Sequence, residues 1–205
     1  MGTFEGAITA LVTPFRGDAV DEKALREIVE HQIVNGIDGI IPAGTTGESV
    51  NLSHAEFEKV VRITIDQARG RVPIIPGVGT ASTRHTLELT QVSKALKADG
   101  VLVVSPYYNR PTQEGLYQHF KAVADVGLPV MLYNIPGRCC VDISLETMER
   151  LASHSSIVSI KEATGNVVRS ADILQRFGSR FTVLSGDDGL TLPIMSVGLS
   201  TSGTP

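Results

Sequence analysis

Short apolar runs alternate with longer amphipathic stretches along almost the whole chain. Seven of the runs have the length and β-branched content of buried strands, and they begin roughly every 25–35 residues. They span residues 7–12, 39–42, 73–76, 101–104, 130–133, 157–161 and 181–184. Apolar positions at helical spacing predict helices over residues 22–35, 55–68, 83–98, 114–124, 145–153, 167–177 and 190–197. This alternation predicts consecutive βα units with parallel strands.

One helix start is marked by side-chain chemistry as well as by periodicity. Ser53-His54-Ala55-Glu56 has the pattern of a capping box, in which the serine hydroxyl and the glutamate carboxylate each accept from a free backbone amide. No Pro- or Ser-rich linker divides the series. We therefore predict one βα domain over residues 1–198. The polar segment that follows, residues 199–205, shows neither the apolar run of a strand nor the apolar spacing of a helix.

Composition narrows the class of protein without identifying it. The chain has 205 residues, a net charge of −4 and no basic stripe, which disfavours nucleic acid and anionic membrane as partners. No apolar stretch reaches the roughly 20 residues of a membrane helix, and the first residues lack the pattern of a signal peptide. Cys139 and Cys140 are adjacent, so neither a disulfide nor a zinc site is expected. A cytoplasmic protein with reduced thiols is the prediction.

Lys161 ends an apolar run, residues 157–160, and is followed by Glu162 and a loop. At the end of a buried strand an ammonium group loses solvation, which lowers its pKa. A neutral amine can attack a carbonyl and form a Schiff base. Most lysines in such a position are solvated loop residues, so the position alone does not decide between the two interpretations.

Further polar side chains follow other predicted strands. Thr45 and Thr46 come after the second, Tyr107 after the fourth, and Tyr133 ends the fifth. In a closed barrel the carboxyl ends of all strands surround one axis, whereas an open sheet would spread these residues along an edge. We therefore favour the barrel. The turn 44–49 can cradle a small anion with its amides and hydroxyls, although an ordinary βα turn has the same pattern.

Five segments together resemble the dihydrodipicolinate synthase family, now called 4-hydroxy-tetrahydrodipicolinate synthase. They are residues 44–48, 105–111, 133–138, 160–166 and 185–188, and the resemblance runs from about Gly6 to Gly198. It implies a TIM-type (β/α)8 barrel with a C-terminal helical extension, assembled as a dimer or tetramer. It also implies the condensation of pyruvate with L-aspartate 4-semialdehyde, in lysine and diaminopimelate biosynthesis, with no metal and no organic cofactor.

The resemblance also implies a role for each matching side chain. Lys161 would form the imine with pyruvate, Tyr133 would be the general acid/base, and Thr45 and Tyr107 would relay protons, the tyrosine from the partner subunit. The substrate-binding positions would be Thr46 for the pyruvate carboxylate, Arg138 for the semialdehyde carboxylate, and Gly186.

In several lineages of the family L-lysine binds at the dimer interface and inhibits. Ser49 and His54 fit that site, but Phe57, Ala81 and His85 stand where the lysine-sensitive pattern has a histidine, an amide and a carboxylate. Without a carboxylate at position 85 to pair with an ammonium group, weak or absent inhibition is expected.

The resemblance ends after Gly198. Seven βα units are recognised, fewer than a barrel of about 250 residues requires. Strand eight, its helix and the C-terminal extension are expected to be missing, and a frameshift or early stop would account for the polar tail. Two alternatives remain open: another pyruvate-dependent class I aldolase, of the N-acetylneuraminate lyase or keto-deoxy-sugar type, and a truncated remnant without catalysis.

Overall fold

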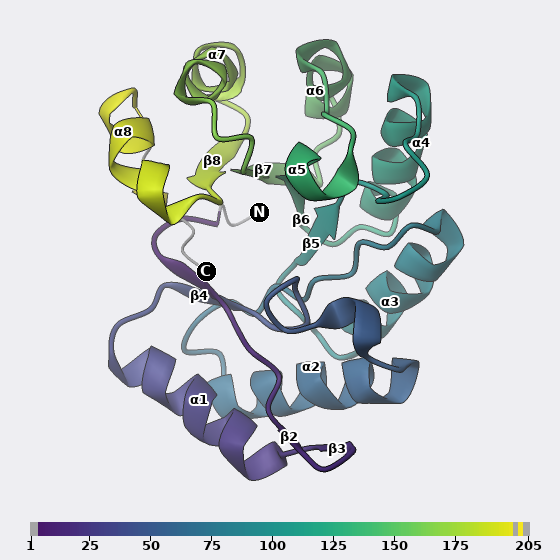
Figure 1. Cartoon of the computed structure of the whole chain (residues 1–205), viewed down its shortest axis with the longest axis vertical. Coiled ribbons are helices and arrows are strands. Elements are labelled where there is room, and N and C mark those ends of the chain that lie inside the picture. Colours follow the sequence, from purple (N-terminus) through teal and green to yellow (C-terminus); the bar gives the residue numbers. More distant parts are fainter. Residues whose placement is uncertain (1–3, 199–200, 203–205) are drawn as a thin grey trace.

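The computed structural model describes residues 4–198 and the backbone of residues 201–202. Parallel strands form the inside of the molecule and helices surround them (Figure 1). The strands of this inner layer are β1 (Ile8–Ala10), β4 (Gly39–Ile41), β5 (Val101–Val104), β6 (Val130–Asn134), β7 (Ile157–Glu162) and β8 (Thr182–Ser185). β1 pairs with β4, and β5 to β8 pair in chain order. The predicted TIM-type barrel architecture is confirmed.

The third predicted strand is present only as isolated bridges. Ile74 bridges Ile40, and Gly77 bridges Leu102, both in parallel, so residues 74–77 connect β4 with β5. Pro73 and Pro76 flank this stretch. Proline has no amide hydrogen to donate to a neighbouring strand, which explains why the pairing here does not extend into a regular ladder.

The predicted helices are all present, with ends that shift by a few residues. They are α1 (Glu22–Val34), α2 (His54–Ala68), α3 (Thr83–Ala95), α4 (Gln113–Ala124), α6 (Leu145–Ala152), α7 (Val167–Phe177) and α8 (Thr191–Ser196). Elements too short to show a periodicity were not predicted: the hairpin β2 (Phe15–Arg16) and β3 (Ala19–Val20), η1 (Ser49–Asn51), α5 (Pro136–Cys139) and η2 (Asp188–Leu190).

The capping box at the start of α2 is confirmed. The Ser53 hydroxyl accepts from the Glu56 amide at 3.3 Å, and the Ser53 amide donates to the Glu56 carboxylate at 2.8 Å. Such a cap contributes about 1 kcal/mol to the stability of a helix. It also fixes the point at which the loop after β4 ends and α2 begins.

Alternate residues of the strands enter two separate apolar clusters. Leu102, Met131 and Leu184 belong to the cluster inside the ring of strands. Val103 and Leu132 belong to the cluster between the strands and the outer helices, where they pack with residues such as the fully buried Phe120. Because side chains alternate between the two faces of a strand, this division tells which later residues of each strand point into the barrel.

The segment after Gly198 differs from the prediction in one respect. Residues Thr201–Ser202 form a short strand, β9, parallel to β8, with Leu184 opposite Thr201 and Ser185 opposite Ser202. A strand pairs through its backbone, so a polar segment can extend a free sheet edge without apolar side chains. Thr201 and Ser202 therefore lie beside β8, where the sequence predicted no further strand. Within the described residues β9 pairs only with β8, and the ring is not closed by pairing to β1.

Candidate active site

Tyr133 and Lys161 lie side by side at the ends of two paired strands. They are register partners in the parallel pair β6 and β7. Both are buried, with exposed fractions of 6% for Tyr133 and 7% for Lys161. The Lys161 Nζ lies 4.8 Å from the centroid of the Tyr133 ring. The structure thus brings the predicted nucleophile and the predicted general acid/base together inside the barrel.

This pairing depends on an irregularity in β7. Val130 pairs with Ile157, but the next residue, Met131, pairs with Ser159, so the register shifts by one residue at this point. A bulge of this kind moves every later side chain of the strand by one place relative to its neighbour. Without the shift, Tyr133 would stand opposite Ile160, and Lys161 would point to the outer helices.

Burial sets the protonation of both groups. Loss of solvation lowers the pKa of the Lys161 amine, and the carboxylate of Asp188 acts in the opposite direction. Lys161 makes no ion pair within 4.0 Å with any residue that the structure describes. Burial raises the pKa of the Tyr133 phenol, with the Arg138 guanidinium opposing that rise. An amine with a lowered pKa beside a phenol that keeps its proton can exchange protons with it.

Gly186 leaves the space that the Lys161 side chain occupies. A Cβ at this position would lie 3.0 Å from the Lys161 Cε and 2.9 Å from the Ala163 Cβ. The Gly186 amide donates to the Glu162 carbonyl at 2.8 Å, which fixes its backbone against β7. A side chain at position 186 would therefore displace the lysine.

Three further predicted residues line one cavity next to this pair. Thr45, Tyr107 and Arg138 surround a cavity of about 370 Å³. Thr45 also lines a smaller cavity together with Tyr133, so the two cavities meet at the threonine. Lys161 itself lines neither of them. Its connection to them is the Tyr133 ring beside its amine.

Thr46 lies next to Thr45 on the turn after β4. Both threonines are exposed, but Thr46, unlike Thr45, lines neither cavity. Its predicted contact with a pyruvate carboxylate therefore stays a prediction. The cavities have a backbone wall that the sequence argument missed, formed by Gly77 and Gly79. A Cβ at Gly79 would lie 2.4 Å from the Val104 amide nitrogen, and the Gly-Val-Gly pattern after the third apolar run was the available signal.

Backbone strain gathers at the same end of the barrel. Of the seven non-glycine residues with positive φ that the structure describes, five have φ between 47° and 72° here, namely Ala43, Glu48, Tyr108, Arg110 and Cys140, and the other two, Arg69 and Lys97, follow α2 and α3. All five lie at the end of β4 or in the loops after β4, β5 and β6. Such conformations cost of order 1–3 kcal/mol each and persist where the surrounding structure requires them, which is common at functional sites.

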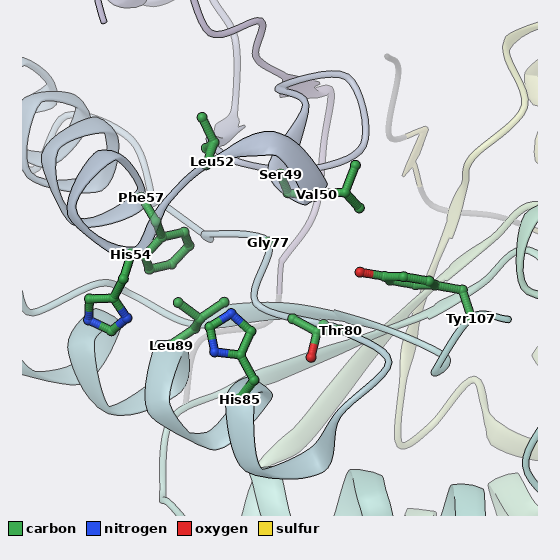
Figure 2. Close-up of a pocket in the computed structure, with 11 residues that line it drawn as sticks. Ser49, Val50, Leu52, His54, Phe57, Gly77, Thr80, His85, Leu89 and Tyr107 are labelled. Carbon is green, nitrogen blue, oxygen red and sulfur yellow. The ribbon is translucent and has the colours of Figure 1, made fainter. Parts of the chain in front are cut away.

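A third cavity, of about 120 Å³, adjoins the larger cavity and shares four lining residues with it, Ser49, Val50, Gly79 and Tyr107. Figure 2 shows His54 and Phe57 of α2 and His85 of α3 around it, with Ser49 of η1 above and Tyr107 on the opposite side. The His85 Nδ1 lies 3.1 Å from the Glu88 carboxylate. No carboxylate belongs to the described lining, and Ala81 is not part of it either.

The amino-acid sequence matches known proteins over nearly its whole length. Residues 3–203 match the model of the dihydrodipicolinate synthetase family, a region that includes most of the segment 199–205. The 4-hydroxy-tetrahydrodipicolinate synthase of Citrifermentans bemidjiense is 54% identical over 196 residues, which are 95% of this chain and 68% of that protein. This chain thus spans about two thirds of that relative.

Solved structures agree with the sequence match. The dihydrodipicolinate synthase of Aquifex aeolicus superposes with a TM-score of 0.95 at 48% identity, over 98% of this chain and 69% of that one. The chloride-inhibited enzyme of Acinetobacter baumannii, solved with pyruvate, gives a TM-score of 0.96 at 46% identity, over 99% and 70%. The chain belongs to the dihydrodipicolinate synthetase family.

Proposed function

We propose that this chain is a 4-hydroxy-tetrahydrodipicolinate synthase, which condenses pyruvate with L-aspartate 4-semialdehyde in lysine and diaminopimelate biosynthesis. The observation that carries the proposal is the buried Lys161 amine beside the Tyr133 ring, at the ends of two paired strands. Relatives that are more than 50% identical to this chain carry the name 4-hydroxy-tetrahydrodipicolinate synthase.

The first step joins the Lys161 amine to the keto carbon of pyruvate. The amine donates its electron pair to that carbon, and the carbonyl oxygen leaves as water once two protons have been supplied. Loss of a proton from the pyruvate methyl group then gives an enamine, which attacks the aldehyde carbon of the second substrate. Each of these steps transfers a proton, and Tyr133, whose ring centroid lies 4.8 Å from the amine, carries a phenol that can exchange it.

The remaining predicted residues have supporting positions. Thr45 lines both cavities and can pass protons between Tyr133 and the larger one, and Tyr107 also lines that larger cavity. Arg138 lines it as well, where its planar guanidinium suits the second substrate's carboxylate. We assign the pyruvate carboxylate to Thr46, and we assign to Gly186 the space for the lysine stem.

The proposal extends to the setting in which the chain acts. Its substrates are the two small molecules, and no cofactor is used. We infer a homo-oligomer in the cytoplasm, a dimer or tetramer, in which Tyr107 acts across the subunit interface, and no nucleic acid or membrane partner. Among the described residues, no helix is long and apolar enough to cross a bilayer.

Trapping with borohydride tests the function directly. The chain is incubated with pyruvate, reduced with sodium borohydride, digested and analysed by mass spectrometry. Reduction of the imine leaves a secondary amine, and Lys161 gains the mass of pyruvic acid less one oxygen. An adduct at Lys161 supports an enzyme of this class. Its absence from folded protein supports the alternative of a non-catalytic remnant.

The second substrate separates the synthase from other pyruvate-dependent aldolases. Arg138 favours the synthase, because a sugar chain requires hydroxyl partners and not a second guanidinium at the cavity wall. Consumption of L-aspartate 4-semialdehyde by the pyruvate-loaded chain is expected. Turnover of N-acetylneuraminate or a keto-deoxy sugar in its place would assign the chain to the aldolase alternative.

A further inference from the structure

The residues that follow Tyr133 and Lys161 form a second pair on the other face of the sheet. Asn134 and Glu162 are register partners in β6 and β7. They are buried, with exposed fractions of 0% and 2%. Since successive side chains of a strand alternate between faces, this pair points away from the barrel interior, toward the outer helices.

The Glu162 carboxylate accepts hydrogen bonds from three different parts of the fold. Asn134 Nδ2 donates to it from β6 at 3.1 Å, and the Thr164 amide donates from the loop after β7 at 2.9 Å. The Arg169 Nε donates from α7 at 3.3 Å. The carboxylate therefore links β6, the end of β7 and the helix that packs outside them.

Arg169 and Asn134 extend this cluster to the loop that carries Arg138. The Arg169 guanidinium lies 3.2 Å from the Asp142 carboxylate and also donates to the Ile143 carbonyl. Asn134 Nδ2 donates to Asp142 at 2.7 Å, and the Ile143 amide donates to Asn134 Oδ1 at 3.2 Å. The Asn134 side chain thus ties the far end of residues 135–143, the segment that includes Arg138, back to the strand end from which the segment starts.

Stability alone is a weak reason for such a cluster. Placing a carboxylate and a guanidinium in the interior removes both from water, and a well-packed apolar pair of the same volume is often no less stable. The polar cluster instead fixes the relative orientation of the segments that it joins, because each of its hydrogen bonds requires a defined donor and acceptor geometry. That geometry constrains the two strand ends on whose inner face Tyr133 and Lys161 stand.

We propose that Asn134, Glu162 and Arg169 form a positioning network that fixes Lys161, Tyr133 and the Arg138 loop relative to one another. The proposal rests on the imine chemistry assigned to Lys161 above. The network touches no substrate and acts through the strand ends. Loss of one member lets the end of β7 shift, which moves the amine away from the phenol and admits water to it.

The test compares Glu162→Gln, Arg169→Gln, Arg169→Lys and the double variant Glu162→Gln/Arg169→Gln with the unaltered chain. Glutamine keeps the shape of Glu162 but places an amide group, itself a donor, among the donors that the carboxylate accepts from. Lysine keeps the positive charge of Arg169 but loses the forked geometry of the guanidinium. The matched control is Glu114→Gln/Arg150→Gln. It removes an ion pair of 2.8 Å between α4 and α6, away from both strand ends.

Two readouts are measured for every variant that gives a native circular dichroism spectrum. The first is the single-turnover rate of pyruvate trapping by borohydride, and the second is the pH at which that rate is half-maximal. We expect each network variant to trap at least tenfold more slowly at neutral pH. Its pH midpoint should rise, because a solvated Lys161 returns toward the ordinary pKa of lysine in the presence of Tyr133 and Asp188, the two groups facing it.

The outcomes separate this inference from the proposed function. If the unaltered chain traps no pyruvate, the proposed function fails. If the unaltered chain and the network variants trap pyruvate with the same rate and pH midpoint, the positioning network is refuted, even if the variants unfold more easily. A double variant no slower than the slower of its two single changes supports a network that acts as one unit. Should Glu162→Gln not fold, Arg169→Lys carries the same comparison.

Discussion

Gly186→Ala should slow imine formation by displacing Lys161 in a chain that still folds. The new Cβ would lie 2.9 Å from the Ala163 Cβ, 3.0 Å from the Lys161 Cε and 3.1 Å from the Lys161 Cγ. Real Cβ atoms essentially never approach another heavy atom so closely. The φ angle of Gly186 lies outside the left-handed region, so alanine meets no backbone strain there. The effect of the substitution is therefore steric.

The flexible lysine stem is the neighbour that can give way. Overpacking a core usually costs about 1–3 kcal/mol, and we expect a cost within that range, because the lysine stem can move aside whereas the Ala163 Cβ is fixed to the backbone. The movement displaces the Lys161 amine from its position 4.8 Å from the Tyr133 ring centroid. A misplacement of about 1 Å in a reacting group can cost on the order of 100-fold in rate. We expect a fall of roughly 10- to 100-fold in the trapping rate.

The assay is borohydride trapping of pyruvate, with thermal unfolding measured on the same samples. Gly189→Ala is the control, because the nearest atom to its new Cβ is the Asp187 Oδ1 at 3.6 Å, an ordinary contact. That control should trap as the unaltered chain does. Equal trapping rates for Gly186→Ala and the unaltered chain would refute the steric argument, and so would an equal loss in both alanine variants.

Three other predictions follow from the site and the core. Arg138→Ala should leave pyruvate trapping unchanged and raise the KM for L-aspartate 4-semialdehyde at least tenfold, since its guanidinium lines the larger cavity away from the amine; steady-state kinetics with each substrate varied will test this, and an unchanged KM would contradict it. L-Lysine at millimolar concentration should inhibit weakly or not at all, because none of the described residues that line the cavity of His54 and His85 has a carboxylate to pair with its ammonium group; a marked, dose-dependent fall in turnover would show otherwise. His119 is buried with Nδ1 2.9 Å from the Thr83 hydroxyl, and burial lowers its pKa from 6.5 to about 4. The unfolded chain binds the proton more readily, so this group's contribution of about 3 kcal/mol is present above pH 6.5 and is lost as the pH falls toward 4. Urea unfolding of His119→Gln should therefore depend less on pH across that window than unfolding of the unaltered chain, and identical slopes would count against the assignment.

The sequence predicted the order of the βα units and singled out Lys161 and Tyr133 as a candidate reactive pair. The strand Val101–Val104 and the helix Val167–Phe177 have the predicted bounds, because their apolar spacing is local and unambiguous. The apolar run before Lys161 drew attention to it, and the resemblance implied the roles of both Lys161 and Tyr133. Pro73 and Pro76 belong to a run that was predicted as a strand, although their missing amide donors limit it to bridges.

Register and long-range polar contacts were beyond the reach of the sequence. The one-residue shift between Val130 and Met131 places Lys161 opposite Tyr133, and no local pattern marks it. The contacts among Asn134, Glu162 and Arg169 join residues that are up to 28 positions apart. A sequence also cannot show which face of a turn a side chain occupies, so the predicted contact of Thr46 with a pyruvate carboxylate stays a prediction.

The sequence by itself therefore determined which chemistry the chain carries: an amine at the end of a buried strand, with hydroxyl groups at the ends of its neighbours. Only the tertiary structure decided whether those groups meet. The reason is physical, since periodicity reflects the solvent contact of each residue, whereas the distance between Lys161 and Tyr133 depends on how two separate strands pair.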